Sequence, residues 1–245
     1  MKRFFLVTIL LLSILTLKAQ QILISDSAVI SLITCSPGEE VYSKFGHTAI
    51  RINDSQHGAD LVFNYGIFSF ETENFYYKFI KGETDYQLGI YDTRYFLPEY
   101  AQRNSIVWEQ ILNLNTVEKR NLINLLLKNY ETENRTYRYN FAFDNCSTRP
   151  RDKIIAALQG HLKYQQPSDP KTFRQWVGVY VGTDTWLKFG IDIIFGMDAD
   201  LHASTNESMF LPENLMDEFQ TAQIHASNGQ YRNLVTEKKI LVTKH

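Results

Sequence analysis

Residues 47–68 carry the pattern that most restricts what this chain can fold into. In HTAIRIN (47–53), the side chains of Thr48, Ile50 and Ile52 alternate with their neighbours, which is the period of a strand with two different faces. DLVFNYGIF (60–68) has the composition of a second strand, and the polar NDSQHG between them predicts a short loop. We therefore predict an antiparallel hairpin.

Short segments of strand and helix character alternate through the rest of the chain. Asn115 with Glu118 three residues on predicts a capped start for one of the helices. The predicted strands are 28–35, 85–93, 105–114 and 137–143, and the predicted helices include 71–82, 94–102, 116–130 and 211–222. A further helix runs to Gly160, with Ser147 or Thr148 as its cap and Pro150 in its first turn. This mixture, with hairpin-style neighbours, favours an α+β fold built on an antiparallel sheet.

The first twenty residues have the layout of a secretory signal peptide. Lys2 and Arg3 precede an apolar run over 4–17, which ends in a short tail at Ala19 and Gln20. The run is shorter than the roughly 20 residues that span a bilayer, so we expect cleavage rather than a retained anchor. The predicted organisation is a signal peptide at 1–20, a core at 21–165 and an aromatic-rich C-terminal part at 166–245, packed on the same domain.

The charge of the exported chain argues against nucleic acid as a partner. Residues 1–20 hold three positive charges and no negative ones, so cleavage takes the formal charge from −2 to −5. Nucleic-acid binding calls for a basic patch or stripe. We predict no further membrane span, because the most apolar remaining stretch, 174–197, is interrupted by Asp184, Lys188 and Asp192.

The chain has two cysteines, and the residue pattern leaves three interpretations open for them. Cys146 precedes a predicted helix, where backbone N–H groups and the helix dipole favour a thiolate and could hold an oxyanion. A thiol nucleophile needs a base, and His47 opens a strand directly after Gly46. A disulfide between Cys35 and Cys146, or two inert thiols, fits the pattern as well. No histidine pair has metal-ligand spacing, so we expect neither a metal nor another cofactor.

Four quoted stretches carry a family resemblance. The chain resembles the Lnb N-terminal periplasmic domain family, the lipoprotein N-acyltransferases of Bacteroides-type bacteria, over roughly 28–226. The stretches that carry the resemblance are TCSPGEEVYSKFGHTAIRI, FNYGIFSF, YRYNFAFDNCSTRPRD and MFLPENL. The family is similar to circularly permuted papain-like (NlpC-type) thiol enzymes, in which a strand-borne histidine precedes a helix-N-terminal cysteine. The resemblance implies that fold, with 21–165 as its thiol core, and a periplasmic, membrane-associated location.

The resemblance also implies roles for particular residues. Cys146 is the expected nucleophile, His47 the base and Asn64 the group that orients the imidazole, although Asn64 also suits a strand-end turn. The side chains next to the thiol are candidates for binding substrate or shaping an oxyanion site: Asp144, Asn145, Ser147, Arg149 and Arg151. For the two arginines, ordinary ion pairs on a helix surface are the alternative.

The reaction implied is acyl transfer through a Cys146 thioester, from a phospholipid to the N-terminal amine of a lipoprotein at the membrane surface. Aromatic side chains are candidates for an acyl-binding surface or for ordinary core: Phe75, Tyr76, Tyr77, Phe79, Trp176, Trp186 and Phe189. Acyltransferases of this family are expected to carry a membrane-spanning region after the domain, and this chain ends without one. It is then the periplasmic part of a longer protein or a soluble relative. A soluble periplasmic cysteine hydrolase and a non-catalytic protein stapled by a disulfide remain the alternatives.

Overall fold

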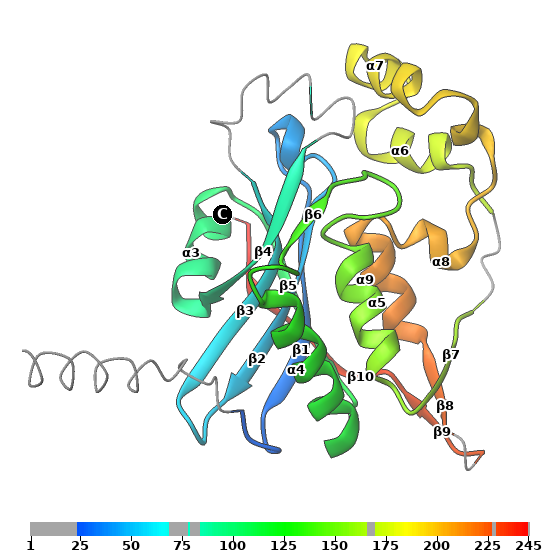
Figure 1. Ribbon diagram of the computed structural model, residues 1–245. Helices are drawn as coiled ribbons and strands as arrows, with labels where there is room; N and C mark the ends of the chain where they lie inside the picture. Colours follow the sequence, from blue (N-terminus) through cyan, green and yellow to red (C-terminus); the bar gives the residue numbers. More distant parts are fainter. Residues whose placement is uncertain (1–23, 69–77, 79–83, 166–169, 227–228, 245) are drawn as a thin grey trace, which may run out of the picture.

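The computed structural model describes residues 24–68, 78, 84–165, 170–226 and 229–244 (Figure 1). The predicted signal peptide lies outside the described residues, as does the predicted helix 71–82 apart from residue 78. The elements, in chain order, are β1 (Val29–Cys35), the 3₁₀ turn η1 (Val41–Ser43), β2 (His47–Asp54), β3 (Ala59–Ile67), β4 (Asp85–Asp92), α3 (Thr93–Gln102), β5 (Val107–Leu112), α4 (Thr116–Tyr130), β6 (Thr136–Arg138), α5 (Thr148–Ala157), β7 (Gly160–Lys163), α6 (Phe173–Val181), α7 (Trp186–Phe195), the 3₁₀ turn η2 (Gly196–Asp200), α8 (Thr205–Ser208), α9 (Pro212–Thr221), β8 (Gln223–Ala226), β9 (Tyr231–Asn233) and β10 (Val235–Val242).

The main sheet of the described chain has seven strands in the order β10-β5-β1-β2-β3-β4-β6, and every neighbouring pair is antiparallel. A second, three-stranded sheet has the order β7-β8-β9. The predicted hairpin is β2–β3, which pairs Ile50 with Phe63 and turns at Gly58, whose φ of 64° suits a residue without a side chain. The α+β class and the antiparallel sheet are confirmed.

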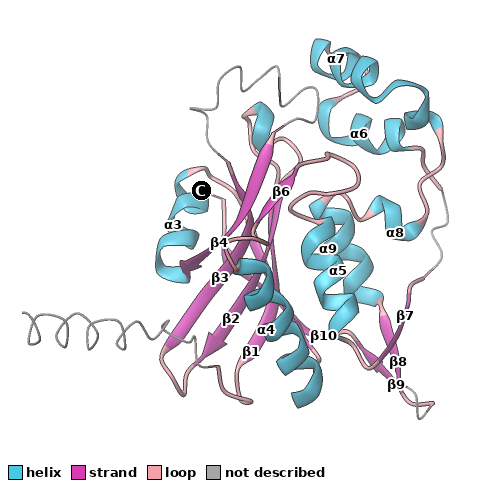
Figure 2. Cartoon of the chain, in the orientation of Figure 1, coloured by secondary structure: helices cyan, strands magenta, loops and turns pink. Residues whose placement is uncertain are grey.

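The main sheet is covered on both faces, as Figure 2 shows. One face packs against α4, α5 and α9, and the other packs against α3. The alternation along β2 follows from this: Ile50 and Ile52 enter the core under α4, α5 and α9, whereas Ala49 faces Phe96 and Tyr100 of α3. Helix α4 begins with the predicted capping box of Asn115 and Glu118.

The C-terminal part contributes to the same sheet and adds a separate helical layer. Strand β10 pairs with β5 along the sheet edge, and α9 packs in the core beneath the sheet. Helices α6 and α7 lie at the other end of the molecule from β8 and β9 (Figure 1). They build a smaller core with η2 and the segment before α9.

Two predicted boundaries differ from the structure near Cys146. The strand expected over 137–143 ends at Arg138, because the side chain of Asn140 accepts hydrogen bonds from the N–H groups of Ala142 and Phe143 and turns the chain. The helix expected to follow a cap at Ser147 or Thr148 begins there, since Ser147 is the N-cap residue of α5, but it ends at Ala157 and not at Gly160. Gly160 starts β7 instead of closing the helix, since its backbone pairs with Ala226.

Candidate thiol site

His47 is the first residue of β2, and its ring is fixed by Asn64 on the neighbouring strand β3. The distance between His47 Nε2 and Asn64 Oδ1 is 2.8 Å. The same oxygen accepts the N–H of Gly66 at 2.8 Å, which identifies it as the carbonyl oxygen of the amide. An amide oxygen only accepts, so Nε2 carries the proton and Nδ1 has the free lone pair.

Gly66 leaves the space that the imidazole occupies. A Cβ at this position would lie 2.5 Å from His47 Cε1 and 3.1 Å from Asn64 Oδ1. The pairing of β3 with β4 shifts register between Asn64 and Ile67, so the glycine sits in an irregular stretch of the strand. Bulges of this kind are enriched beside functional sites, where they aim a side chain.

Burial holds His47 in its neutral form. The loss of hydration lowers the pKa of the imidazole from 6.5 to about 4, and the positive charge of Arg103 acts in the same direction. The hydrogen bond to Asn64 raises the pKa and only partly compensates. The ring lies nearly parallel to that of Tyr100 from α3, with an angle of 13° between the planes. At neutral pH the ring is therefore a base with one free nitrogen.

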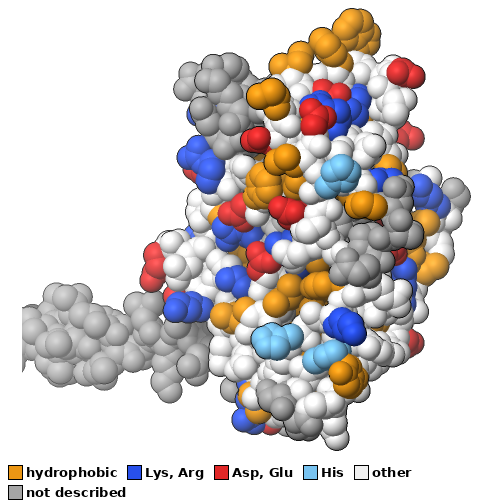
Figure 3. All heavy atoms as spheres, turned by 90° about the vertical axis from the view of Figure 1, so that its right-hand side faces the viewer, with side chains coloured by type: hydrophobic (Ala, Val, Ile, Leu, Met, Phe, Trp, Pro, Cys, Tyr) orange, Lys and Arg blue, Asp and Glu red, His pale blue; other side chains and the backbone are white. Residues whose placement is uncertain are grey.

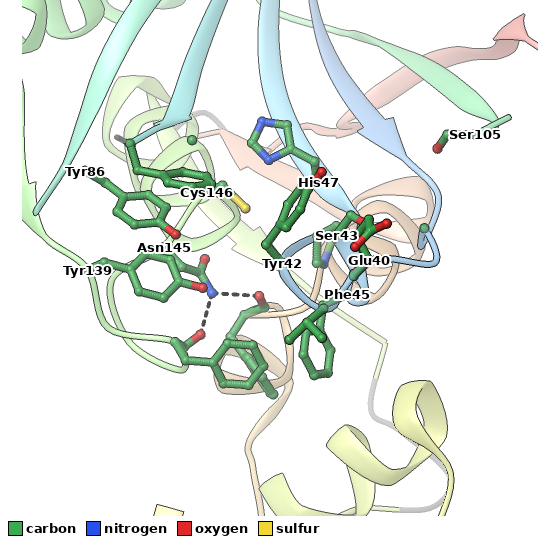
Figure 4. Close-up of a pocket in the computed structure, with 18 of the residues that line it drawn as sticks. Glu40, Tyr42, Ser43, Phe45, His47, Tyr86, Ser105, Tyr139, Asn145 and Cys146 are labelled. Atoms are coloured by element: carbon green, nitrogen blue, oxygen red, sulfur yellow. Dashed lines mark hydrogen bonds between the residues drawn. The ribbon is translucent and has the colours of Figure 1, made fainter. Parts of the chain in front are cut away.

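Cys146 precedes α5, in a loop held by the side chain of Asn145. The Oδ1 atom of Asn145 accepts the N–H groups of Ser147, the N-cap residue, at 2.7 Å and of Thr148, the first residue of α5, at 2.9 Å. Its amide nitrogen donates to the carbonyls of Phe141 and Phe210, the two dashed bonds in Figure 4. Asn145 therefore fixes the position of the cysteine next to it.

The thiol is protonated at neutral pH, contrary to the thiolate expected from its place before a helix. Burial raises the pKa of Cys146 to about 11. Hydrogen bonds to the sulfur from the backbone N–H groups of Thr48 and of Cys146 itself act in the opposite direction, but the loss of hydration outweighs them. The expectation was wrong because it considered the helix end without the apolar surroundings that the fold places around it.

The thiol and the imidazole meet at the end of the sheet. A backbone hydrogen bond from Thr48, which directly follows His47, reaches the sulfur. His47 and Cys146 both line one cavity, in which Figure 4 draws them together. Because Nε2 of the ring is held by Asn64, Nδ1 is the nitrogen that can accept the thiol proton. The fold thus unites the three side chains for which the sequence predicted nucleophile, base and orienting roles.

The disulfide alternative is contradicted by the structure. Both cysteines are free. Cys35 is the last residue of β1, is fully buried and faces Phe96 and Tyr100 of α3. Cys35 therefore packs as a small core residue. The alternative of a non-catalytic protein held by a Cys35–Cys146 disulfide does not fit this structure.

The other predicted substrate-binding side chains have structural contacts around the loop. Asp144 binds the guanidinium of Arg149 through two hydrogen bonds of 2.5 and 2.8 Å, and that guanidinium lies over the ring of Tyr137. Ser147 is buried and donates to the carbonyl of Met209 at 2.9 Å. Arg151 is buried and donates to the carbonyl of Asn206 and to the carboxylate of Asp152. Of the five, Asn145 borders the cavity described next.

A cavity of about 1180 Å³ contains the site. Its volume exceeds the roughly 300 to 1000 Å³ of ordinary small-ligand pockets. His47, Asn64 and Cys146 lie at the end formed by the sheet, and Leu187 and Ile191 of α7 lie in its opposite wall. Aromatic side chains supply much of the lining: Tyr42, Phe45, Phe68, Tyr86, Tyr91, Tyr95, Phe96, Tyr100, Tyr139, Phe141, Phe143, Phe173, Trp186, Phe195 and Phe210. The cavity is thus large and mainly apolar, with polar groups around the thiol.

The predicted acyl-binding aromatics divide among several places. Trp186 lines the cavity, Trp176 packs in the α6–η2 core, and Phe189 is exposed on α7. Four of them lie outside the described residues: Phe75, Tyr76, Tyr77 and Phe79.

Sequence reasoning missed Gly66 and most of the cavity lining. An isolated glycine inside a strand pattern, two residues after Asn64, is the signal that points to a close approach at Gly66. No comparable signal exists for the lining, because Phe45, Tyr86 and Phe141 have the sequence character of ordinary core residues.

Comparison with known proteins gives one family. The model of the Lnb N-terminal periplasmic domain matches residues 16–178, about two-thirds of the chain, and the protein belongs to this family. The family supports a periplasmic location in the cell envelope. No curated protein and no solved structure matches the chain. Within the described residues, helices with the length and apolar character of a membrane span are absent.

Proposed function

We propose that this member of the Lnb N-terminal periplasmic domain family is a cysteine-dependent acyltransferase. Its substrates are a phospholipid, which supplies a fatty acyl chain, and the N-terminal amine of a lipoprotein, which receives it. One observation carries the proposal: the Cys146 thiol shares one large, mainly apolar cavity with an imidazole that Asn64 holds with its free nitrogen available. Thiol, base and orienting amide are the groups that acyl transfer through a thioester requires.

In the first half-reaction, Cys146 attacks the ester carbonyl of the phospholipid while His47 Nδ1 takes the thiol proton. The carbon–sulfur bond forms and the carbon–oxygen bond breaks, and the departing lysophospholipid alkoxide recovers the proton from His47. With the thiol pKa at about 11 and the imidazole pKa at about 4, the resting pair is neutral. His47 therefore acts as a general base during the attack, without a preformed thiolate.

In the second half-reaction, the lipoprotein amine attacks the thioester carbonyl. His47 takes one proton from the amine, the carbon–nitrogen bond forms, and the sulfur leaves and is protonated again. The backbone N–H groups of Thr48 and Cys146 interact with the sulfur, and we assign to them the stabilisation of the oxyanion that forms in each half-reaction.

Two further features support acyl transfer in a permuted papain-like fold. The histidine strand β2 comes before the cysteine and α5 in the chain, which is the order of the permuted enzymes. The volume and the aromatic lining of the cavity suit a long hydrocarbon chain rather than a polar peptide.

Intact-mass measurement of the purified protein incubated with phospholipid tests the first half-reaction. We expect a fatty-acyl adduct on the wild-type protein and none on Cys146→Ala. Cys35→Ala is the matched control, because Cys35 is the other free thiol and is fully buried. An adduct that persists in Cys146→Ala would contradict the proposal.

The acceptor is tested by adding a diacylated lipopeptide with a free N-terminal cysteine amine to the acylated protein. Transfer predicts an N-acylated peptide, whereas a periplasmic cysteine hydrolase releases free fatty acid at the same rate with or without the peptide. The second outcome would replace the transferase by the hydrolase and keep the roles of Cys146 and His47.

A further inference from the structure

Helix α7 presents apolar side chains in two different directions. One stripe, Leu187, Ile191 and Phe195, packs against the α6–η2 core and lines the cavity. A second stripe faces solvent, where Phe189 and Ile193 are 59% and 65% exposed. A helix in water normally turns a polar face outward, and a helix that is apolar all round is normally buried in protein or lipid.

The exposed stripe is continuous and uncharged. It begins at Trp186 and ends at Met197 in η2, both 88% exposed. Residues 186, 189 and 193 follow one another at helical spacing, so they form a ridge along α7. Met197 follows the helix end at Gly196 and adds an exposed apolar side chain from η2. Figure 3 shows apolar side chains at the upper rim of the molecule, where α7 lies in Figure 1. Val179 of α6, 64% exposed, adds to this surface.

The charged side chains of α7 are turned away from the ridge. Lys188 is buried and donates to Asp192 at 2.6 Å. Asp192 also pairs with Arg174 of α6 at 2.9 Å, and Arg174 binds Asp200 of η2 at 2.7 Å. These four residues neutralise one another, so the ridge along α7 itself carries no charged side chain, although Asp184 and Asp198 are exposed just beyond its two ends.

We propose that α7 is a membrane-interface anchor, which inserts its outer ridge into the surface of a phospholipid bilayer. The ridge begins at the exposed Trp186, and tryptophan is a residue that favours the boundary between headgroups and acyl chains. Ten residues of helix rise about 15 Å, half of a bilayer core, so α7 lies along the surface instead of crossing it. The inner stripe of the same helix lines the thiol cavity, so an acyl chain passes from the bilayer to Cys146 along one element.

This inference rests on the proposed function for its purpose, but vesicle binding tests it without any reaction. The protein without residues 1–20 is mixed with phosphatidylcholine vesicles, and the bound fraction is measured by flotation. The test variant combines Phe189→Gln, Ile193→Gln and Met197→Gln, because glutamine keeps helix propensity while it removes the apolar surface. Trp186 is retained as a fluorescent reporter, and its emission should shift to the blue on binding.

The matched control replaces exposed apolar side chains far from α7, with Val117→Gln, Tyr231→Gln and Ile240→Gln on α4, β9 and β10. We expect at least about a 10-fold loss of vesicle affinity in the α7 variant and none in the control. Binding should change little with salt or with added phosphatidylglycerol, because the ridge carries no charge.

Several outcomes would overturn the anchor. The first is that the wild-type protein does not bind vesicles, and the second is that both triple variants lose the same amount of vesicle affinity. The third is that the α7 ridge mediates self-association in sedimentation without any vesicle binding. A second assay tests the proposed function independently of vesicle binding: it measures the Cys146 adduct with phospholipid supplied in detergent micelles. Vesicle binding without an adduct refutes the acyltransferase alone, and an adduct without vesicle binding refutes the anchor alone.

Discussion

Replacing Gly66 with alanine is the most specific test of the geometry around His47. The Cβ of alanine would lie 2.5 Å from His47 Cε1 and 3.3 Å from His47 Nδ1, and ordinary contact begins at 3.4 Å. The imidazole must therefore move by about 0.9 Å to relieve the overlap. Gly66 does not have a positive φ, so alanine fits the backbone there and the clash falls on the ring.

A shift of this size affects the reaction far more than the fold. A misplacement of about 1 Å at a reacting group costs roughly 100-fold in rate. The hydrogen bond from Nε2 to Asn64, now 2.8 Å, is strained by the same movement. We expect Gly66→Ala to slow formation of the Cys146 acyl adduct by about 100-fold, while the melting temperature stays within a few degrees of wild type.

The measurement is the single-turnover rate of adduct formation, followed by intact mass, beside a thermal melt. Gly178→Ala on α6 is the control, since its Cβ would meet Lys188 Cε at 3.5 Å and Thr183 Cγ2 at 4.0 Å, both ordinary contact distances. The double variant with His47→Ala gives the decisive comparison: once the imidazole is absent, only the milder contact with Asn64 Oδ1 at 3.1 Å remains, and Gly66→Ala should slow the reaction little further.

Two results would refute this reasoning. A wild-type rate in Gly66→Ala would show that the ring is not confined as the contact distances require. An equal slowing of the His47→Ala background would show that the glycine acts on the fold and not on the imidazole.

The remaining predictions concern the same site. Asn64→Ala should slow adduct formation by about 10- to 1000-fold, less than His47→Ala, because it frees the ring without removing the base; a wild-type rate would leave Asn64 as a turn residue. Adduct formation should be constant down to about pH 4 and fall below it, as the pKa of His47 is about 4 and only the neutral ring accepts a proton; a fall centred near pH 6.5 would contradict the burial of the ring. The pKa of His47 is lower in the folded protein than its usual 6.5, so its contribution to stability is complete above pH 6.5 and is lost as the pH falls to about 4. The melting temperature of the wild type should therefore fall with pH over this range, and His47→Gln should lack this part of the fall. Alkylation of Cys146 by iodoacetamide should be slow at pH 7 and rise toward pH 11; a plateau near neutral pH would indicate a thiolate. Asn145→Ala should lower the free energy of unfolding by about 2–3 kcal/mol in urea titrations, because the hydrogen bonds of its side chain to the backbone of Phe141, Phe210, Ser147 and Thr148 are removed.

Local pattern was sufficient to predict most elements of the sheet. The period-2 alternation of 47–53 reports which side chains point to each face, and burial of Ile50 and Ile52 on one side enforces that register. The capping box at Asn115 was equally predictable, since its partner Glu118 is only three residues away. The end of the strand before Cys146 was less predictable from the sequence. The Asn140 side chain ends it by accepting a backbone hydrogen bond, which the alternation of side chains does not reveal.

The sequence by itself determined the chemical groups: a thiol before a helix, a histidine opening a strand, and, through the family resemblance, an asparagine to hold that histidine. Only the tertiary structure decided their state. The apolar surroundings that raise the pKa of Cys146 and lower that of His47 come from segments distant in the chain, and desolvation depends on all of them together. The two apolar faces of α7 follow the same rule. No helix was predicted there from the sequence, and only the packed fold shows which stripe is covered and which is left exposed.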